Sequence, residues 1–405
     1  MRISFLCIAF LFGACDGSGP GEQQSIVLPT SAEVTLTNGT VSVVLDSLSM
    51  VSRSKWNYDP NALDLFSEPI NSAGLWLAAE QEGTRSNIAS PFPWANGFEL
   101  MSTEKESGGI YEITRENLEF EILNWPISLG APVEINGNPK MYGDRMAWAA
   151  FEPSSTPGDE STSLKGLRVG LSIFVFDQAP LSNSVFLRYD IKNISSETIS
   201  NLHVGYGGDT DLVQYRESSG KICETAWWEN QTGYDLSRHI TFTYTSRHPE
   251  DSVQSDDCYG AVAGYSILNM SSPRGLGQNK LAHRIWRRNQ FASYPEFSGE
   301  LLENGEVILF ALQGLSPSGA PMVDPSGTQT KFAFTGDPIA MTGWIDERHD
   351  VRSLQSIQPV DLAPGDERSI TVAWLMAKGP NLETGLELFK EQFDLIMSRR
   401  DAWDF

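Results

Sequence analysis

Stretches in which apolar and polar residues alternate recur along this chain, and turn residues separate them. Two of them, at 34–37 and 41–45, flank Asn38-Gly39. An Asn-Gly pair between alternating stretches is the strongest short-range signal for a β-hairpin. The pattern also predicts strands over 74–78, 111–114, 118–122, 167–176, 185–191, 199–204 and 369–376. Many short strands separated by turns predict a mainly β fold, a large antiparallel β-sandwich of either one lobe or two.

Residues 381–398 have the spacing of an amphipathic helix. Apolar side chains recur at three- and four-residue steps, with charged residues between them. These apolar side chains are Leu386, Phe389, Phe393 and Ile396. A helix with one apolar stripe needs a partner surface, so we expect this C-terminal helix to pack on a sheet. The sandwich domain as a whole is expected at 29–400, and the loop-like composition of 152–165 makes that segment the expected boundary if there are two lobes.

The first fifteen residues have the pattern of a secretory signal. A positive charge at Arg2 is followed by an apolar run and by the small residues Gly13 and Ala14 before Cys15. The apolar run is too short to span a bilayer as a helix. Because it ends in Ala-Cys, we expect a bacterial lipoprotein signal at 1–14, lipid on Cys15 and a flexible tether over 15–28. The expected location is extracytoplasmic, anchored to the envelope and facing either the periplasm or the cell surface.

Acidic residues outnumber basic ones by 52 to 29, which gives a formal charge of −23. A field of that sign repels nucleic acid, so no nucleic-acid partner is expected. It also repels anionic lipid, so the lipid on Cys15 is the only membrane contact we expect. The sequence contains no nucleophile-elbow, zinc-protease, phosphate-loop or dinucleotide-binding motif. These features favour a binding protein over an enzyme.

Two cysteines remain once Cys7 is assigned to the signal and Cys15 to the lipid. Cys223 and Cys258 are an even pair in an oxidising compartment. We expect a disulfide that closes a loop of about 36 residues and stabilises the fold by roughly 3–4 kcal/mol.

An acidic segment follows the strand expected at 199–204. Asp209 and Asp211 lie one residue apart after Gly207-Gly208 in what reads as a glycine-rich loop, and Glu217 and Glu224 come next. Calcium takes six to eight oxygen ligands from such side chains, so these four are the expected ligands of a structural calcium ion. The alternative is an Asp-rich turn whose carboxylates cap backbone amides.

Three further groups of residues invite a functional interpretation. Trp227 and Trp228 could stack on sugar rings, although adjacent tryptophans in a strand more often serve packing. The basic run 283–288 could hold an anionic sugar, or pair with the many carboxylates. In the charge cluster 346–352, Asp346 and Asp350 could act as acid and base on a glycoside, but ion pairing with Arg348 and Arg352 is the simpler interpretation.

Several short motifs occur in a fixed order: SAGLWL at 72–77, FTGDP at 334–338, TGW at 342–344, DVRSL at 350–354, LAPGD at 362–366 and ITVAW at 370–374. In this order they resemble a group of uncharacterised secreted or cell-surface proteins of Bacteroidota-like bacteria, which often carry a type IX secretion sorting domain. The resemblance implies an extracytoplasmic β-rich module and no known reaction. That group also carries an acidic loop and a Cys-Asp-Thr-like segment, where this chain has Cys223, Glu224 and Thr225. Here lipid anchoring is expected to replace the sorting route.

The sequence therefore predicts a lipid-anchored β-sandwich that binds or scaffolds at the cell envelope, with a glycan or surface protein as its partner. The alternative is a carbohydrate-active enzyme or a carbohydrate-binding module. The enzyme alternative requires Asp209, Asp211, a tryptophan at 227 or 228, and Asp346 or Asp350 to line one cleft.

Overall fold

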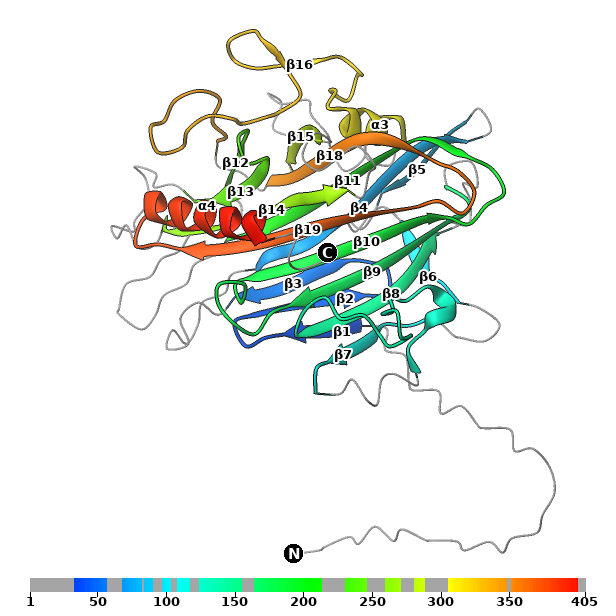
Figure 1. Ribbon diagram of the computed structural model, residues 1–405. Helices are drawn as coiled ribbons and strands as arrows, with labels where there is room; N and C mark the ends of the chain where they lie inside the picture. The colour runs from blue at the N-terminus through cyan, green and yellow to red at the C-terminus, as the bar shows by residue number, and fades with distance from the viewer. Residues whose placement is uncertain are drawn as a thin grey trace, which may run out of the picture.

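The protein is a mainly antiparallel β-sandwich with a C-terminal helix, as predicted from the sequence. The computed structural model describes residues 33–56, 68–81, 84–89, 97–102, 108–116, 124–154, 164–212, 230–245, 259–270, 280–287, 305–347 and 351–399. Within these ranges two large sheets face each other, and a helix lies on the outer face of each (Figure 1).

The first large sheet has eight strands among the described residues. In spatial order they are β1 (Glu33–Thr37), β2 (Val41–Asp46), β3 (Val51–Trp56), β4 (Glu68–Gln81), β11 (Ile199–Asp211), β18 (Val351–Leu362) and β15 (Lys280–Arg287), with β5 (Thr84–Ala89) also paired to β4.

The second large sheet has nine strands among the described residues. In order they are β12 (Gln231–Asp235), β13 (Ile240–Tyr244), β14 (Ala261–Met270), β19 (Glu367–Lys378), β10 (Ser184–Asn193), β9 (Leu167–Val175), β8 (Arg145–Pro153) and β6 (Phe98–Leu100), with β7 (Tyr111–Thr114) also paired to β8. A small pair, β16 (Met322–Val323) with β17 (Gln329–Thr330), stands apart from both.

The Asn-Gly hairpin forms where the sequence predicts it. Strands β1 and β2 pair in register from Glu33↔Asp46 to Thr37↔Ser42. Gly39 has φ +87°, a conformation that glycine adopts without strain. The Asn38 side chain accepts from the backbone N–H of Val41 at 2.8 Å and donates to the carbonyl of Phe176 at 2.7 Å. Its amide therefore ties the hairpin to the chain just after β9, in the opposite sheet.

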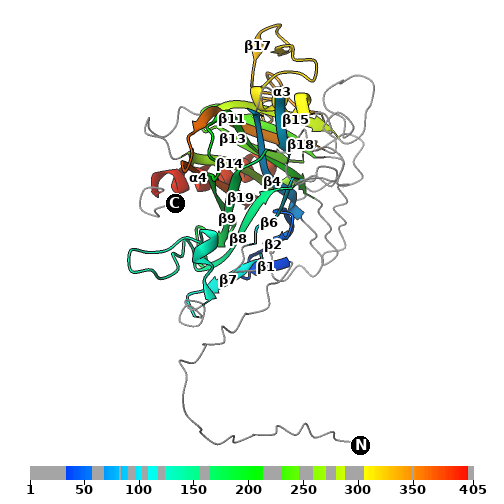
Figure 2. The same cartoon turned by 90° about the vertical axis from the view of Figure 1, so that its right-hand side faces the viewer.

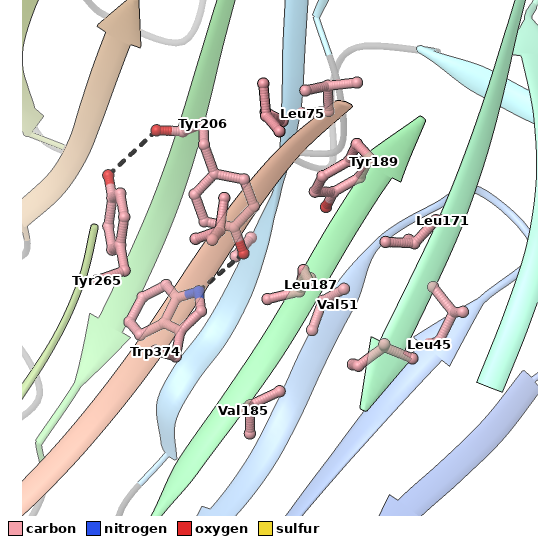
Figure 3. Close-up of a cluster of buried hydrophobic side chains, with 14 of the residues drawn as sticks. Leu45, Val51, Leu75, Leu171, Val185, Leu187, Tyr189, Tyr206, Tyr265 and Trp374 are labelled. Atoms are coloured by element: carbon pink, nitrogen blue, oxygen red, sulfur yellow. Dashed lines mark hydrogen bonds between the residues drawn. The ribbon is translucent and has the colours of Figure 1, made fainter. Parts of the chain in front are cut away.

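The inner faces of the two sheets bury one continuous apolar core. Figure 3 shows its aliphatic side chains beside an aromatic group that links the sheets. Trp374 Nε1 donates to the hydroxyl of Tyr206 at 2.7 Å, and the Tyr265 hydroxyl donates to the Tyr206 carbonyl at 3.3 Å. Burial raises the pKa of Tyr189 and Tyr206 well above the ordinary value. Burial therefore favours the neutral form of both hydroxyls.

The C-terminal helix α4 (Leu382–Arg399) covers the outer face of the nine-stranded sheet, which Figure 1 shows in red against β19 and β14. Its buried side chains include the four apolar residues predicted from their spacing. Asn381 caps the helix, because its side-chain oxygen accepts from the Thr384 N–H at 2.9 Å. Arg238 in the β12–β13 turn ion-pairs with Asp394 at 2.8 Å and so fixes the helix to that hairpin.

A second helix, α3 (Gly305–Gln313), was not expected from the sequence. It packs Ile308, Leu309 and Leu312 on the outer face of the eight-stranded sheet, against Trp76 and Leu354. Nine residues that are apolar almost throughout give no helical stripe, so their periodicity cannot separate a buried helix from a buried strand.

The other predicted strands within the described residues are confirmed: β7 has the predicted bounds, β9 ends one residue earlier, and the rest are longer than predicted. The segment 74–78 lies within β4, and the strand expected to end at 204 continues as β11 to Asp211. The prediction for 118–122 lies outside the described residues. Strands β8 and β9, which flank the loop predicted at 152–165, are hydrogen-bonded neighbours in one sheet. Among the described helices, none combines the length and apolar character needed to cross a membrane.

His203 lies on the outer face of β11 beneath α3. It is 4% exposed, and Gln313 Nε2 of α3 donates to its Nε2 at 3.5 Å. Burial lowers the pKa of His203, and the positive charge of Lys331 lowers it further. The folded protein therefore holds a neutral imidazole under the helix.

Stability should therefore fall on mild acidification. Because the folded-state pKa of His203 lies below the unfolded value, the unfolded chain binds the proton first. The stabilisation is complete above about pH 6.5 and is lost as pH falls below it, by at most about 1.4 kcal/mol per pH unit. Denaturant unfolding of wild type and His203→Gln between pH 7.5 and 5.5 measures this loss. We expect a shallower pH dependence in the variant, and equal slopes would contradict the assignment.

Candidate functional site

The prediction of a glycine-rich loop at 207–211 is wrong, because these residues form the last part of strand β11. The two glycines serve packing. A Cβ on Gly207 would lie 2.9 Å from the indole nitrogen of Trp76, and one on Gly208 would lie 2.6 Å from the ring of Trp374. The two indoles approach the strand from opposite faces. Gly207-Gly208 resembles a turn in the sequence, but in the structure it belongs to a strand that passes between two tryptophans.

Asp209 is ion-paired inside the protein. Its Oδ2 accepts from Arg352 Nη2 at 2.9 Å, and the two side chains are only 6% and 7% exposed. The residues are register partners on the neighbouring strands β11 and β18. Charged side chains are rarely buried unless they are paired. The pair therefore satisfies two charges that the fold has removed from water.

The other acidic residues at this end of the sandwich also have protein partners. Asp211 accepts from the Asn71 amide at 2.6 Å. Asp346 accepts from the backbone N–H of Thr232 at 3.0 Å and is 3% exposed. Asn230, next to this contact in the chain, donates to the Thr210 carbonyl at 3.2 Å. Hydrogen bonds thus bring Asp346 to the end of β11, and we call Asp209, Asp211, Asp346 and Arg352 together the acidic end.

The structure tests the predicted calcium site only in part. Asp209 and Asp211 share a strand, whereas Glu217 and Glu224 lie outside the described residues. In the described part of the chain, no three His, Cys, Asp or Glu side chains are grouped so that they could hold a metal ion. Calcium binding stays a prediction.

Several other predicted residues also lie outside the described ranges. They are Cys15, Cys223, Cys258, Trp227, Trp228 and Asp350. The lipid anchor, the disulfide and the sugar-stacking tryptophans therefore stay predictions. Of the basic run at 283–288, the backbone of 283–287 belongs to strand β15, next to β18.

A second polar group, which sequence reasoning missed, lies on the outer face of the nine-stranded sheet. Arg188 and Asp190 of β10 point away from the core, because the alternate residues Leu187 and Tyr189 face it. Arg188 Nε donates to Asp190 Oδ1 at 3.0 Å, and its Nη2 donates to Ser369 Oγ of β19 at 2.9 Å. Their side chains are 21% and 19% exposed, about three times as much as those of the Asp209–Arg352 pair.

Aromatic side chains border this polar group. The Arg188 guanidinium carbon lies 5.2 Å from the centre of the Tyr142 ring. On the neighbouring strand β9, Gly170 carries no side chain, and a Cβ built there would lie 3.4 Å from the indole nitrogen of Trp148. Tyr142 belongs to the segment 124–144, drawn in teal beside β8 in Figure 2. We call Trp148, Gly170, Arg188, Asp190 and Ser369 the Arg188 patch.

Comparisons with known proteins give structural similarity without sequence similarity. No protein-family model matches the chain, and no curated protein matches it. Among solved structures, a protein named as an aldose 1-epimerase from Escherichia coli K12 is similar at TM-score 0.36 and 9% identity, covering 86% of this chain and 99% of that one. A galactose mutarotase-like protein from Clostridium acetobutylicum gives 0.35 and 8%, covering 86% and 95%. One from Lactobacillus casei gives 0.32 and 6%, covering 85% and 99%. Values this low assign the chain neither an activity nor a ligand.

Breaking the buried ion pair should destabilise the protein strongly. Asp209→Asn removes the carboxylate charge that lies 2.9 Å from the buried Arg352 guanidinium, and breaking such a pair costs about 3–5 kcal/mol. Asp177→Asn is the matched control, because Asp177 pairs with Arg145 at 3.4 Å near the surface, with side chains 45% and 35% exposed. The control should cost less than about 1 kcal/mol. Urea unfolding at pH 7 gives both values, and an Asp209→Asn variant as stable as wild type would show that the pair is not structural.

Proposed function

We propose that this chain is an extracytoplasmic, lipid-anchored protein that binds a ligand at the cell envelope without transforming it. The observation that carries the proposal is the Asp209–Arg352 pair, at 2.9 Å and almost fully buried. Asp209, which belongs to the strongest candidate site in the sequence, neutralises the buried guanidinium of Arg352. Asp211 and Asp346 likewise accept hydrogen bonds from the protein. A general acid or base instead has to reach a reacting group and exchange a proton with it.

The binding part of the proposal is supported by the contrast between the two polar groups. The acidic end holds its ion pair buried, whereas the Arg188 patch is partly exposed and is built on four adjacent strands, β8, β9, β10 and β19. Binding sites need polar groups that are fixed by the scaffold yet remain within reach of a ligand. Arg188, held by Asp190 and Ser369, is such a group.

The location is proposed from the sequence of the first fifteen residues. In a bacterial host, we expect the full chain to incorporate radiolabelled palmitate and to sediment with the membrane fraction. Cys15→Ser removes the acceptor thiol and should abolish both. Cys223→Ser is the matched cysteine control and should leave labelling intact. An unlabelled wild-type protein in the soluble fraction would overturn the anchor.

A carbohydrate-active enzyme is the second candidate, because Asp209, Asp211 and Asp346 do gather at one end of the sandwich. The candidate also requires a tryptophan at 227 or 228, and both positions lie outside the described residues, as does Asp350, the alternative to Asp346. Release of reducing ends from bacterial envelope polysaccharide by the full Cys15→Ser chain separates the two functions. The binding proposal expects no release. Release that is lost in Asp211→Asn would establish the enzyme and overturn the proposal.

A further inference from the structure

We propose that the Arg188 patch binds a neutral saccharide through hydrogen-bonding groups that the protein itself leaves unused. The inference rests on the binding role proposed above and names the class of ligand and its site. The strands that build the patch are central to the nine-stranded sheet. The site would therefore be a rigid sheet surface instead of a loop.

Arg188 and Asp190 present one donor and one acceptor side by side. Arg188 uses Nε toward Asp190 and Nη2 toward Ser369, while Asp190 uses Oδ1. Among the described residues, Arg188 Nη1 and Asp190 Oδ2 have no partner. The internal contacts fix the plane of the guanidinium, so Nη1 is held in place before any ligand arrives.

A third donor lies next to this pair. Trp148 Nε1 lies beside Gly170, and no described residue accepts its hydrogen bond. The Cβ of Asp190 is 3.8 Å from the same point above Gly170. Because Gly170 has no side chain, the indole nitrogen of Trp148, a residue only 1% exposed, and the Cβ of Asp190 approach the same point on the outer face of the sheet.

Two buried hydroxyl groups flank Arg188 in register. Ser172 of β9 and Thr371 of β19 are its partners on either side, and both residues are fully buried. Neither hydroxyl oxygen has a hydrogen-bond partner among the described residues. Native proteins leave few buried polar groups unsatisfied. These two hydroxyls add to the unused polar groups of Arg188, Asp190 and Trp148 in one part of the sheet.

The balance of charge favours a neutral ligand. Arg188 and Asp190 neutralise each other, so a ligand carboxylate or phosphate attracted to the guanidinium would also meet the aspartate. A sugar hydroxyl both donates and accepts. Two neighbouring hydroxyls can therefore accept from Arg188 Nη1 and donate to Asp190 Oδ2 at once, with Trp148 Nε1 donating to a third oxygen. A neutral saccharide offers such rows of hydroxyls.

Equilibrium binding of the full Cys15→Ser chain to a panel of neutral hexoses, pentoses and their α- and β-linked disaccharides tests the inference. Arg188→Met should abolish binding, and Trp148→Phe, which removes the indole N–H and keeps an aromatic ring, should weaken it about ten-fold. Arg145→Met and Trp374→Phe are the matched controls. Arg145 lies in the exposed pair with Asp177, and Trp374 faces the inner core. Both controls should bind as wild type does.

Each outcome decides the inference. Loss confined to the two patch variants, with near-ultraviolet circular dichroism showing that they fold, supports it. If Arg188→Met does not fold, Trp148→Phe and Asp190→Asn carry the test. Wild-type binding that no patch variant alters places the saccharide elsewhere and overturns the site while the binding function stands. A wild type that binds no saccharide of the panel overturns the ligand class. Co-sedimentation of the same chain with isolated envelope fragments then tells whether the binding function fails with it.

Discussion

Strand β11 is buried on both faces, between the core and helix α3. The packing of its neighbours depends on the small residues that make this burial possible. On one face, Val204 and Tyr206 reach the core between the sheets; on the other, Gly205 lies under α3, where a Cβ would be 2.4 Å from Leu312. Gly207 and Gly208 then make room for one tryptophan from each side. Small residues are thus placed where large neighbours approach, which is how interiors reach close packing.

The same strand carries its charge into the interior. Asp209 follows the two glycines and meets Arg352 across the β11–β18 ladder. A buried ion pair contributes little net stability against a well-packed apolar pair, but it is costly to break. Its effect is therefore to fix which residues of β11 and β18 face each other, since a slip of one residue would separate the two buried charges. The Arg188 patch differs, because its charges are held by the sheet yet reach solvent.

Sequence patterning was sufficient to predict the sandwich, the first hairpin and the C-terminal helix. In each of them the buried side chains follow the regular spacing of a strand or a helix. It failed at Gly207-Gly208, where glycine usually marks a turn and the deciding contacts come from Trp76 and Trp374, far away in the chain. It also failed for α3, whose residues are apolar on nearly every side. Of the site, sequence located Asp209, Asp211 and Asp346 but not the partner of Asp209. The Arg188 patch was missed because Arg188 and Asp190 look like the polar face of any strand until β9 and β19 bring Gly170 and Ser369 beside them.

We propose that the two outer faces have different roles: one holds a buried ion pair, and the other binds a ligand through its hydrogen-bonding groups. A crystal structure of the chain grown with a neutral disaccharide tests this division most directly. The account predicts sugar density on the nine-stranded sheet, with hydroxyl groups within hydrogen-bonding distance of Arg188 Nη1, Asp190 Oδ2 and Trp148 Nε1. Sugar density at Asp209, Asp211 and Asp346, with the Arg352 pair opened, would contradict it.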